Sequence, residues 1–321
     1  MLFVGQTRFS LFRPEDPSWR LSQKESRLSE AAYKARLYDD DRLALRSKIF
    51  LEHTVPTLQE AADRSGDEVV HLVSYSESLP SGYQDKLHEA AAAFPILRLD
   101  PQQDGKMGSR PSDLARSRTE PREIFGVYRL DDDDVLPITF FEYVGQYMKP
   151  EMVGMLVSLP RGIEGIAYRE RVLNLREGYY PMHSMGLMQV CAFDENGDLE
   201  APRPAPHDKS DRQNPVIIDS RNIGYFRINH AGQDHRLQHG REVDLRQIAD
   251  RMRRFESWHN GQTVVDLFPT LSEIVGYTDP WEGSLSKPVT LRSGIGSKLD
   301  RVKNLKRAIY GAWRTGRGTR L

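Results

Sequence analysis

The stretch FGVYRLDDDDVLPITFFEYV, residues 125–144, sets four consecutive aspartates between two hydrophobic segments. Residues 125–130 predict a buried strand, because β-branched and aromatic residues dominate them. Residues 135–148 predict a helix with Pro137 in its first turn, where proline is tolerated. The aspartates therefore follow the end of a strand, which is where open α/β sheets bind ligands.

The acidic run itself indicates a cation site. Neighbouring carboxylates raise each other's pKa, and they destabilise a dehydrated site unless a cation neutralises them. Alternate residues of a strand share a face, so we expect Asp131 and Asp133 to point together. Carboxylate oxygens prefer hard cations such as Mg²⁺ or Mn²⁺, which also stabilise a departing diphosphate. The alternative is a solvated loop in which Asp134 caps the following helix.

The segments around this run predict an α/β fold. Strands and helices alternate before it: strands at 2–12, 69–75 and 96–99, and helices at 41–63, kinked near Pro56, and 83–94. This order is typical of a parallel sheet with crossover helices. After the run we expect strands at 154–159, 166–175, 187–193, 216–220 and 225–229, and a helix at 243–258.

Composition limits the possible classes. The 321 residues include 45 basic and 46 acidic ones, so the whole chain has no bias toward nucleic acid. No apolar run is long enough to span a membrane, and the N-terminal segment reads as a core strand rather than a signal peptide. The single cysteine, Cys191, excludes an intramolecular disulfide and fits a reducing cytoplasm. Its apolar neighbours predict that Cys191 is buried and not a nucleophile.

The C-terminal tail carries a basic block. Residues 287–321 contain ten Lys or Arg residues and one acid, Asp300. Apolar residues between Leu299 and Trp313 fall near one face of a predicted helix. Such a helix either lies on an anionic membrane surface or packs on the rest of the protein with its basic face in solvent.

The ordered segments resemble the bacterial rhamnosyltransferase family of GT-A-type glycosyltransferases. The matching pieces are RFSLFRP, DDRLALRSKIFLEHTVPTLQ, VSYSESLPSGYQDKL and RLDDDD, and together they cover roughly residues 8–148. The resemblance implies a GT-A-like mixed sheet flanked by helices, with a loop-rich C-terminal part. It implies a nucleotide-sugar-binding half at 1–150, an acceptor-side half at 151–260 and a helical basic extension at 261–321.

The resemblance also implies roles for the aspartates. In GT-A enzymes the first aspartate of the motif contacts the ribose and the last binds the metal. Carried over, Asp131 contacts the nucleotide and Asp133 and Asp134 hold Mn²⁺ or Mg²⁺. Because four aspartates allow the motif to shift by one residue, Asp132 is grouped with Asp131 at the nucleotide.

Three further residues complete the expected site. Arg8, at the end of the first strand, is expected beside the nucleotide. His230, in YFRINHAGQ, is expected as a late metal ligand, with His235 and His239 as rivals. Asp219, which ends the strand VIID, is expected to be the general base that deprotonates the acceptor hydroxyl, with Asp234 as its rival.

The expected activity is inverting, cation-dependent transfer of a sugar from a nucleoside-diphosphate sugar to an acceptor hydroxyl. The resemblance suggests dTDP-rhamnose as donor, a glycan or lipid-linked acceptor, and a cytoplasmic location with possible contact to the inner membrane face. Two alternatives stay open. One is a metal-dependent phosphotransferase or nucleotidyltransferase, although the chain lacks a Gly-rich phosphate loop with lysine. The other is a non-catalytic cation-binding module of the cell envelope.

Overall fold

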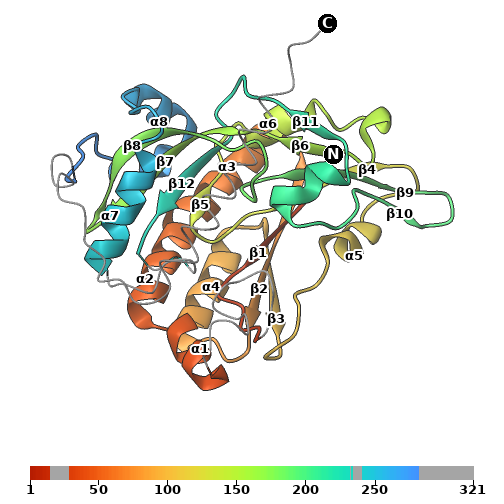
Figure 1. The fold of residues 1–321 in the computed structure, drawn as a ribbon. Helices are drawn as coiled ribbons and strands as arrows, with labels where there is room; N and C mark the ends of the chain where they lie inside the picture. The colour runs from red at the N-terminus through yellow and green to blue at the C-terminus, as the bar shows by residue number, and fades with distance from the viewer. Residues whose placement is uncertain (15–28, 232, 234–240, 282–321) are drawn as a thin grey trace, which may run out of the picture. The chain divides into compact units, whose positions relative to one another are not determined.

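A computed structural model describes residues 1–14, 29–231, 233 and 241–281. Residues Met1–Pro280 form one compact unit, which contains two β-sheets and the helices around them (Figure 1). The predicted boundaries at 150/151 and 260/261 stay predictions. The basic tail from 282 onward, with its predicted helix, lies outside the described residues, as do Asp234, His235 and His239.

Within the described residues, eight strands form the larger sheet in the order β11-β6-β9-β4-β1-β2-β3, with β10 paired to β9. Its strands are β1 (Leu2–Arg8), β2 (Glu68–Ser76), β3 (Leu97–Gln102), β4 (Ile124–Arg129), β6 (Leu156–Ser158), β9 (Met188–Phe193), β10 (Leu199–Glu200) and β11 (Val216–Ile218). The strands β3, β2, β1 and β4 run parallel, whereas β9 is antiparallel to both β4 and β6. The predicted α/β fold with a mixed sheet flanked by helices is therefore confirmed.

A second sheet has the order β5-β12-β7-β8. Its strands are β5 (Asp134–Val135), β12 (Tyr225–Asn229), β7 (Arg161–Tyr168) and β8 (Arg171–Tyr179). The single strand predicted at 166–175 was wrong, because the chain turns at Arg169, whose φ is +56°, and returns as β8.

The helices follow the predicted segments only in part. They are α1 (Glu30–Leu37), α2 (Asp40–Lys48), α3 (Val55–Ser65), α4 (Ser81–Ala93), α5 (Pro111–Arg116), α6 (Phe140–Gly145), α7 (Arg241–Met252) and α8 (Gly261–Leu267), with short 3₁₀ turns at Pro150–Met152, His207–Arg212 and Pro269–Leu271. The irregularity expected at Pro56 is instead a π-helical segment, η2 (Ile49–Thr54), between α2 and α3. Proline lies in the first turn of α3, where its missing N–H costs nothing.

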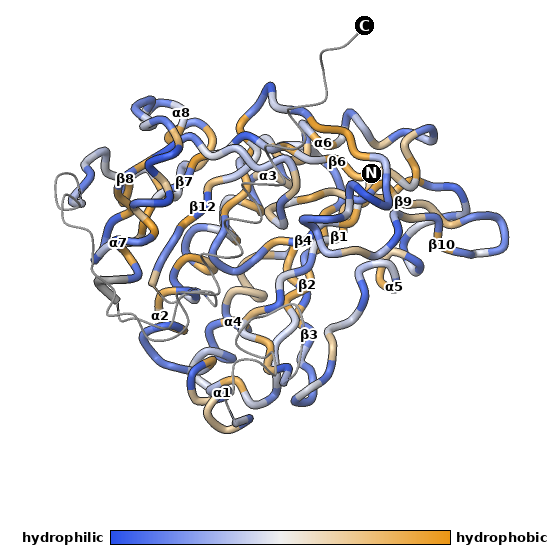
Figure 2. Tube along the Cα trace, viewed as in Figure 1, coloured by the Kyte–Doolittle hydropathy of each residue, from blue (hydrophilic) through white to orange (hydrophobic). Residues whose placement is uncertain are grey.

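Hydrophobic residues along the strands pack against these helices. Figure 2 shows them concentrated on the strands of the larger sheet, whereas the turn between β9 and β10 is hydrophilic. Aromatic rings hold α6 on the sheet: Phe3 and Phe141 have centroids 5.0 Å apart, and Tyr128 and Phe140 have centroids 5.8 Å apart. Cys191 is buried with 2% of its surface exposed, as predicted. No helix in the described part of the chain is long and apolar enough to cross a membrane.

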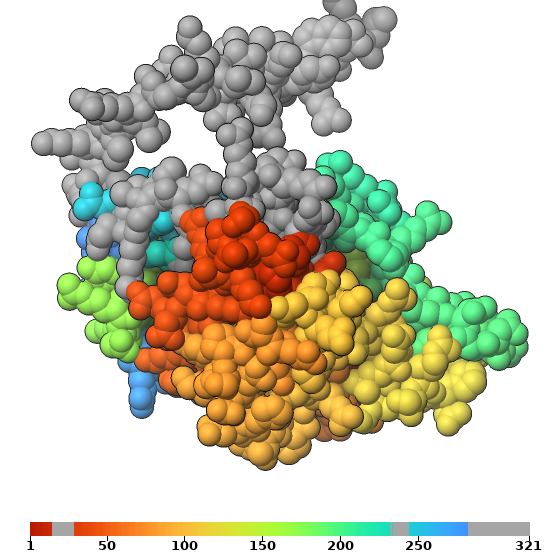
Figure 3. Space-filling view, turned by 90° about the horizontal axis from the view of Figure 1, so that it is seen from below, coloured from red at the N-terminus to blue at the C-terminus, as the bar shows by residue number. Residues whose placement is uncertain are grey.

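Segments far apart in sequence meet at the rim of the larger sheet. Figure 3 shows residues near 115, in yellow, beside residues near 200, in green. The guanidinium of Arg116 donates to the carbonyl of Gly197 at 2.5 Å and lies over the ring of Phe193 at 4.4 Å. This contact joins α5 to the β9–β10 hairpin.

Candidate functional site

The aspartate run joins the two sheets. It begins where β4 ends and finishes in β5, so Asp134 belongs to a strand of the second sheet and caps no helix. Residues 131–134 form a turn, closed by a 3.3 Å hydrogen bond from Asp134 N to Asp131 O. Strand alternation therefore does not apply, and the expectation that Asp131 and Asp133 share a face was wrong. The helix predicted at 135–148 is reduced to α6, because its first residue, Val135, lies in β5.

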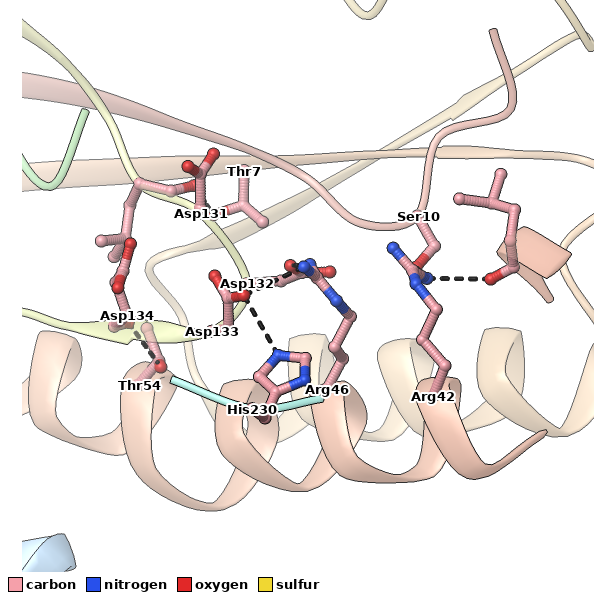
Figure 4. A network of polar contacts seen from close by, with 12 residues as sticks. Thr7, Ser10, Arg42, Arg46, Thr54, Asp131, Asp132, Asp133, Asp134 and His230 are labelled. Atoms are coloured by element: carbon pink, nitrogen blue, oxygen red, sulfur yellow. Dashed lines mark hydrogen bonds and ion pairs between the residues drawn. The ribbon is translucent and has the colours of Figure 1, made fainter. Parts of the chain in front are cut away.

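Two buried threonines fix the two ends of the run. Thr7 on β1 donates to the carbonyl of Leu130 at 2.8 Å, and Thr54 in η2 donates to the carbonyl of Asp134 at 2.9 Å. The π-helical segment thus has a clear effect, because it brings Thr54 beneath β5 (Figure 4). Such segments are common at functional sites.

The centre of the run is held by an arginine. The Arg46 guanidinium, from α2, donates through Nη1 to Asp132 and through Nη2 to Asp133 Oδ2 at 2.9 Å. All three side chains are buried, with exposed fractions of 9% for Arg46, 2% for Asp132 and 8% for Asp133. His230, just after β12, places Nε2 3.2 Å from Asp133 Oδ2 (Figure 4).

The outer aspartates also face arginines. Asp131 accepts from Arg129 Nε at 3.1 Å and Nη2 at 2.7 Å, and from Ser184 Oγ at 3.1 Å. Asp134 and Arg227 are directly opposed in the antiparallel pair β5–β12, so their side chains share one face of the sheet.

Burial and these charged partners shift the pKa values of the aspartates in different directions. Burial raises the pKa of Asp134 well above its usual value, and the negative charge of Asp133 adds to this. Burial also raises the pKa of Asp132, to about 6, although Arg46 opposes the shift. Burial alone would raise the pKa of Asp133, but Arg46 and the hydrogen bond from His230 outweigh it and lower that pKa. Negative charge therefore gathers on Asp133.

His230 is neutral by the same reasoning. Burial lowers the pKa of its imidazole, although Asp133 opposes the shift. The hydrogen bond to Asp133 then requires the proton on Nε2, which leaves Nδ1 as an acceptor. In the part of the chain that the structure describes, His230 Nδ1 and Asp132 Oδ2 are buried without a hydrogen-bond partner.

A cavity of about 1050 Å³ opens beside the run. Six arginines and five aspartates line it: Arg8, Arg42, Arg46, Arg129, Arg203, Arg227, Asp131, Asp132, Asp133, Asp134 and Asp208. Two histidines, His183 and His207, and backbone and side chains of the 202–206 loop complete the wall.

The structure brings together most of the predicted site residues. Arg8 and all four aspartates line the cavity, and His230 lies against Asp133. Asp133, Asp134 and His230 do not surround a common point, and no group of three metal-ligating side chains occurs among the described residues.

Asp219 lies elsewhere and does not line the cavity. Its carboxylate accepts from Arg221 Nε at 2.9 Å and Nη2 at 2.8 Å, and from the Tyr147 hydroxyl at 2.8 Å. The hydrogen bonds from Arg221 hold the pKa of Asp219 far below its usual value. A carboxylate held in this way is a weak base.

Among the residues of the cavity wall that sequence reasoning missed are Arg46, Arg227 and His207. A signal for Arg46 was present, because Arg42 and Arg46 are four residues apart on a predicted helix and so share a face. Both are buried: counted over the whole residue, 4% of the surface of Arg42 and 7% of that of Arg46 is exposed. Arg227 and His207 carried no comparable signal.

Comparison with known proteins identifies the N-terminal half. Residues 3–159 match the model of a family described as "Putative rhamnosyl transferase". No curated protein matches the chain. Every site residue on β1, α2 and the aspartate run falls inside the matched segment.

Solved structures give only distant likenesses. Residues 1–349 of TarS from S. aureus, in complex with UDP-GlcNAc, share 10% identity, with 85% of this chain and 71% of that chain covered and a TM-score of 0.40. A longer TarS structure shares 10% identity over 83% of this chain and 40% of that chain, with a TM-score of 0.34. HddC from Yersinia pseudotuberculosis shares 10% identity over 78% and 99%, with a TM-score of 0.28. Scores this low carry no argument, so the family match decides. The match over residues 3–159 supports the family described as "Putative rhamnosyl transferase", and the protein is a glycosyltransferase.

Proposed function

We propose that this enzyme transfers a sugar, rhamnose by family, from a nucleoside-diphosphate sugar such as dTDP-rhamnose to an acceptor hydroxyl, with inversion at the anomeric carbon. The observation that carries the proposal is the cavity beside the aspartate run, where six arginines face a ligand-sized space. Guanidinium groups bind phosphate oxygens through paired N–H donors.

The nucleotide end of the donor is proposed to lie near Asp131 and Arg8. Asp131 is ionised and held in place by Arg129 and Ser184, so it can accept from a ribose hydroxyl. Asp132 Oδ2, buried and without a partner in the described structure, is a second acceptor that a hydroxyl of the donor would satisfy.

The divalent cation that the resemblance implies does not fit the residues as they stand. Arg46 uses oxygens of both Asp132 and Asp133, and His230 donates to the same oxygen of Asp133. Asp133 Oδ2, on one of the expected ligands, therefore already accepts from two protein donors. We derive no step through a metal.

The acceptor hydroxyl needs a base within the cavity wall. His183 has both ring nitrogens engaged, with Leu159 O at 3.1 Å and Met185 N at 3.1 Å. His207 makes no side-chain hydrogen bond to any described residue. Its imidazole pKa is lower than the usual 6.5, first because the ring is partly shielded from water and second because the positive charge of Arg129 opposes protonation. We therefore propose His207, in place of Asp219, as the base.

The transfer then balances as one displacement. The acceptor oxygen forms a bond to the anomeric carbon while its proton moves to His207. The bond from that carbon to the diphosphate oxygen breaks, and its electron pair leaves with the nucleoside diphosphate. The arginines of the cavity stabilise the negative charge that develops on the leaving oxygen.

The acceptor is proposed to be a glycan or a lipid-linked glycan, with the reaction in the cytoplasm at the inner membrane face. The basic tail at residues 287–321 is the segment proposed to contact anionic lipid.

The test is thermal unfolding with a panel of nucleoside diphosphates and sugar nucleotides. Ligand at 100 times its dissociation constant adds about 2.7 kcal/mol to the unfolding free energy, which is a clear shift in Tm. We expect one nucleotide to shift wild type and Asp219→Asn equally, and Asp131→Asn much less. Release of nucleoside diphosphate from the sugar nucleotide, rather than pyrophosphate, distinguishes glycosyl transfer from nucleotidyl transfer. If no nucleotide shifts any of the three proteins, the proposed donor site is refuted.

A further inference from the structure

Every aspartate of the run already faces an arginine. Arg129 pairs with Asp131, Arg46 bridges Asp132 and Asp133, and Arg227 opposes Asp134 across the β5–β12 pair. Asp132 Oδ2 has no hydrogen-bond partner in the described structure, but the charge of each carboxylate is opposed by a guanidinium and is not left for a divalent cation to neutralise.

Arg46 lies between two carboxylates of the run. Its two terminal nitrogens contact one oxygen each of Asp132 and Asp133, a planar, permanently charged fork between two carboxylates. A cation that bound both carboxylates would have to displace this guanidinium. The Arg46 side chain is only 9% exposed, so moving it away from the two carboxylates would remove the stabilisation that they give to a buried charge.

The cavity as a whole is already positive. Its six arginines outnumber its five aspartates even if every aspartate is ionised. A diphosphate brings negative charge to this cavity, so it gains attraction without a metal.

Arg227 has N–H donors available for the ligand. It lines the cavity, lies 5.7 Å above the ring of Tyr180, and interacts with Asp134 and Glu164 through charge. It makes no side-chain hydrogen bond to any residue that the structure describes. Its guanidinium can therefore donate to phosphate oxygens without breaking an existing bond.

We propose that this glycosyltransferase binds its sugar-nucleotide donor without a divalent cation: the Arg46 guanidinium takes the cation's place between Asp132 and Asp133, and Arg227 supplies N–H donors and positive charge to the diphosphate. This inference rests on the proposed function, because it assigns the diphosphate of that donor to the same cavity.

The test is calorimetric titration of dTDP and UDP into the full-length protein, once in EDTA and once in Mn²⁺. We expect the nucleotide that binds to have a dissociation constant that differs less than threefold between the two buffers. Arg227→Met, which keeps the length of the side chain but removes its charge and donors, should weaken binding at least tenfold in EDTA. Arg221→Met is the matched control, because Arg221 pairs with Asp219 outside the cavity, and it should bind like wild type.

A second variant tests the role of Arg46 without any nucleotide. Wild type should show no stabilisation by Mn²⁺ alone in thermal unfolding, whereas Arg46→Met, which exposes two carboxylates to the same space, should gain a Mn²⁺-dependent increase in Tm. Circular dichroism checks that this variant folds, and the Arg227→Met titration stands if it does not.

Each result decides a different claim. Nucleotide binding that needs Mn²⁺ overturns the cation-free inference and leaves the donor site intact. Equal binding by wild type and Arg227→Met in EDTA overturns the role of Arg227. No binding in either buffer refutes the proposed function and this inference with it.

Discussion

Acidification should destabilise the protein through His71, a buried histidine behind the aspartate run. Thr7 uses its only hydroxyl proton on the carbonyl of Leu130, so His71 Nε2, 2.8 Å from Thr7 Oγ1, must be the donor of that pair. His71 Nδ1 then accepts from the Tyr128 hydroxyl at 3.1 Å. The neutral ring is therefore fully satisfied, and it ties β1, β2 and β4 together at the residue before Asp131.

The size of the effect follows from the pKa. Burial lowers the pKa of His71 from 6.5 to about 3. The folded state therefore resists protonation, and its stability is complete above pH 6.5 and is lost as pH falls from 6.5 toward 3. Each pH unit in this window costs about 1.4 kcal/mol, so lowering pH from 7 to 5 should remove about 2 kcal/mol through this one group.

Urea unfolding at pH 7, 6 and 5, followed by far-UV circular dichroism, measures this loss. His71→Gln keeps a donor and an acceptor but cannot be protonated, so it should lose about 2 kcal/mol less than wild type between pH 7 and 5. His259→Gln, at an exposed position, should lose as much as wild type. Other buried histidines contribute equally to all three proteins. If wild type and His71→Gln lose stability in parallel, the neutral His71 network is wrong.

Two further outcomes follow. Gly5→Ala should cost at least about 1–3 kcal/mol in urea unfolding, because a Cβ there would lie 2.3 Å from His71 Nδ1 and 2.3 Å from Tyr128 Cζ. Gly82→Ala on α4 meets nothing within 4 Å and should leave stability unchanged or higher; equal losses would contradict the packing argument. His207→Gln should lower kcat by about 10²–10⁴-fold with little change in the KM for donor, as expected for a lost general base. Asp219→Asn should stay within severalfold of wild type, and the reverse pattern would restore Asp219 as the base.

Sequence periodicity was enough for the first half of the larger sheet. β1, β2, β4 and α4 were predicted within a few residues, because their apolar patterns are long and regular. The position of the acidic run at the end of β4 followed from the same pattern.

Pairing across long separations could not be predicted. Asp134 enters a strand because β12, more than ninety residues later, offers Phe226 and Arg227 as its partners. The local pattern of residues 135–148 is helical, and the strand forms only because tertiary pairing overrides that preference. The error affects the site, because Asp134, expected as a metal ligand or alternatively as a helix cap, lies on the face that Arg227 shares.

The same limit applies to the charges. The meeting of Arg46 with Asp132 spans 86 residues, and that of His230 with Asp133 spans 97. The family resemblance led us to expect His230 and Asp133 as ligands of one metal, and it gave no expectation for Arg46, although both contacts depend on the same turn. A run of aspartates by itself indicates that a cation balances its charge. The local sequence does not show whether that cation is a metal ion or an arginine.

The overall composition does not reveal that arginines pair with the aspartate run and surround one cavity. The formal net charge of −1 describes a chain in which basic and acidic residues nearly cancel. The fold nevertheless places six arginines around one cavity and pairs its acidic run from within. Charge that is paired before the ligand arrives does not need to reorganise when the ligand binds, and a preorganised positive cavity both attracts a diphosphate and stabilises it as it departs. In the cation-free binding that we propose, the aspartates act by fixing the arginines in place, instead of holding a metal as their spacing first indicates.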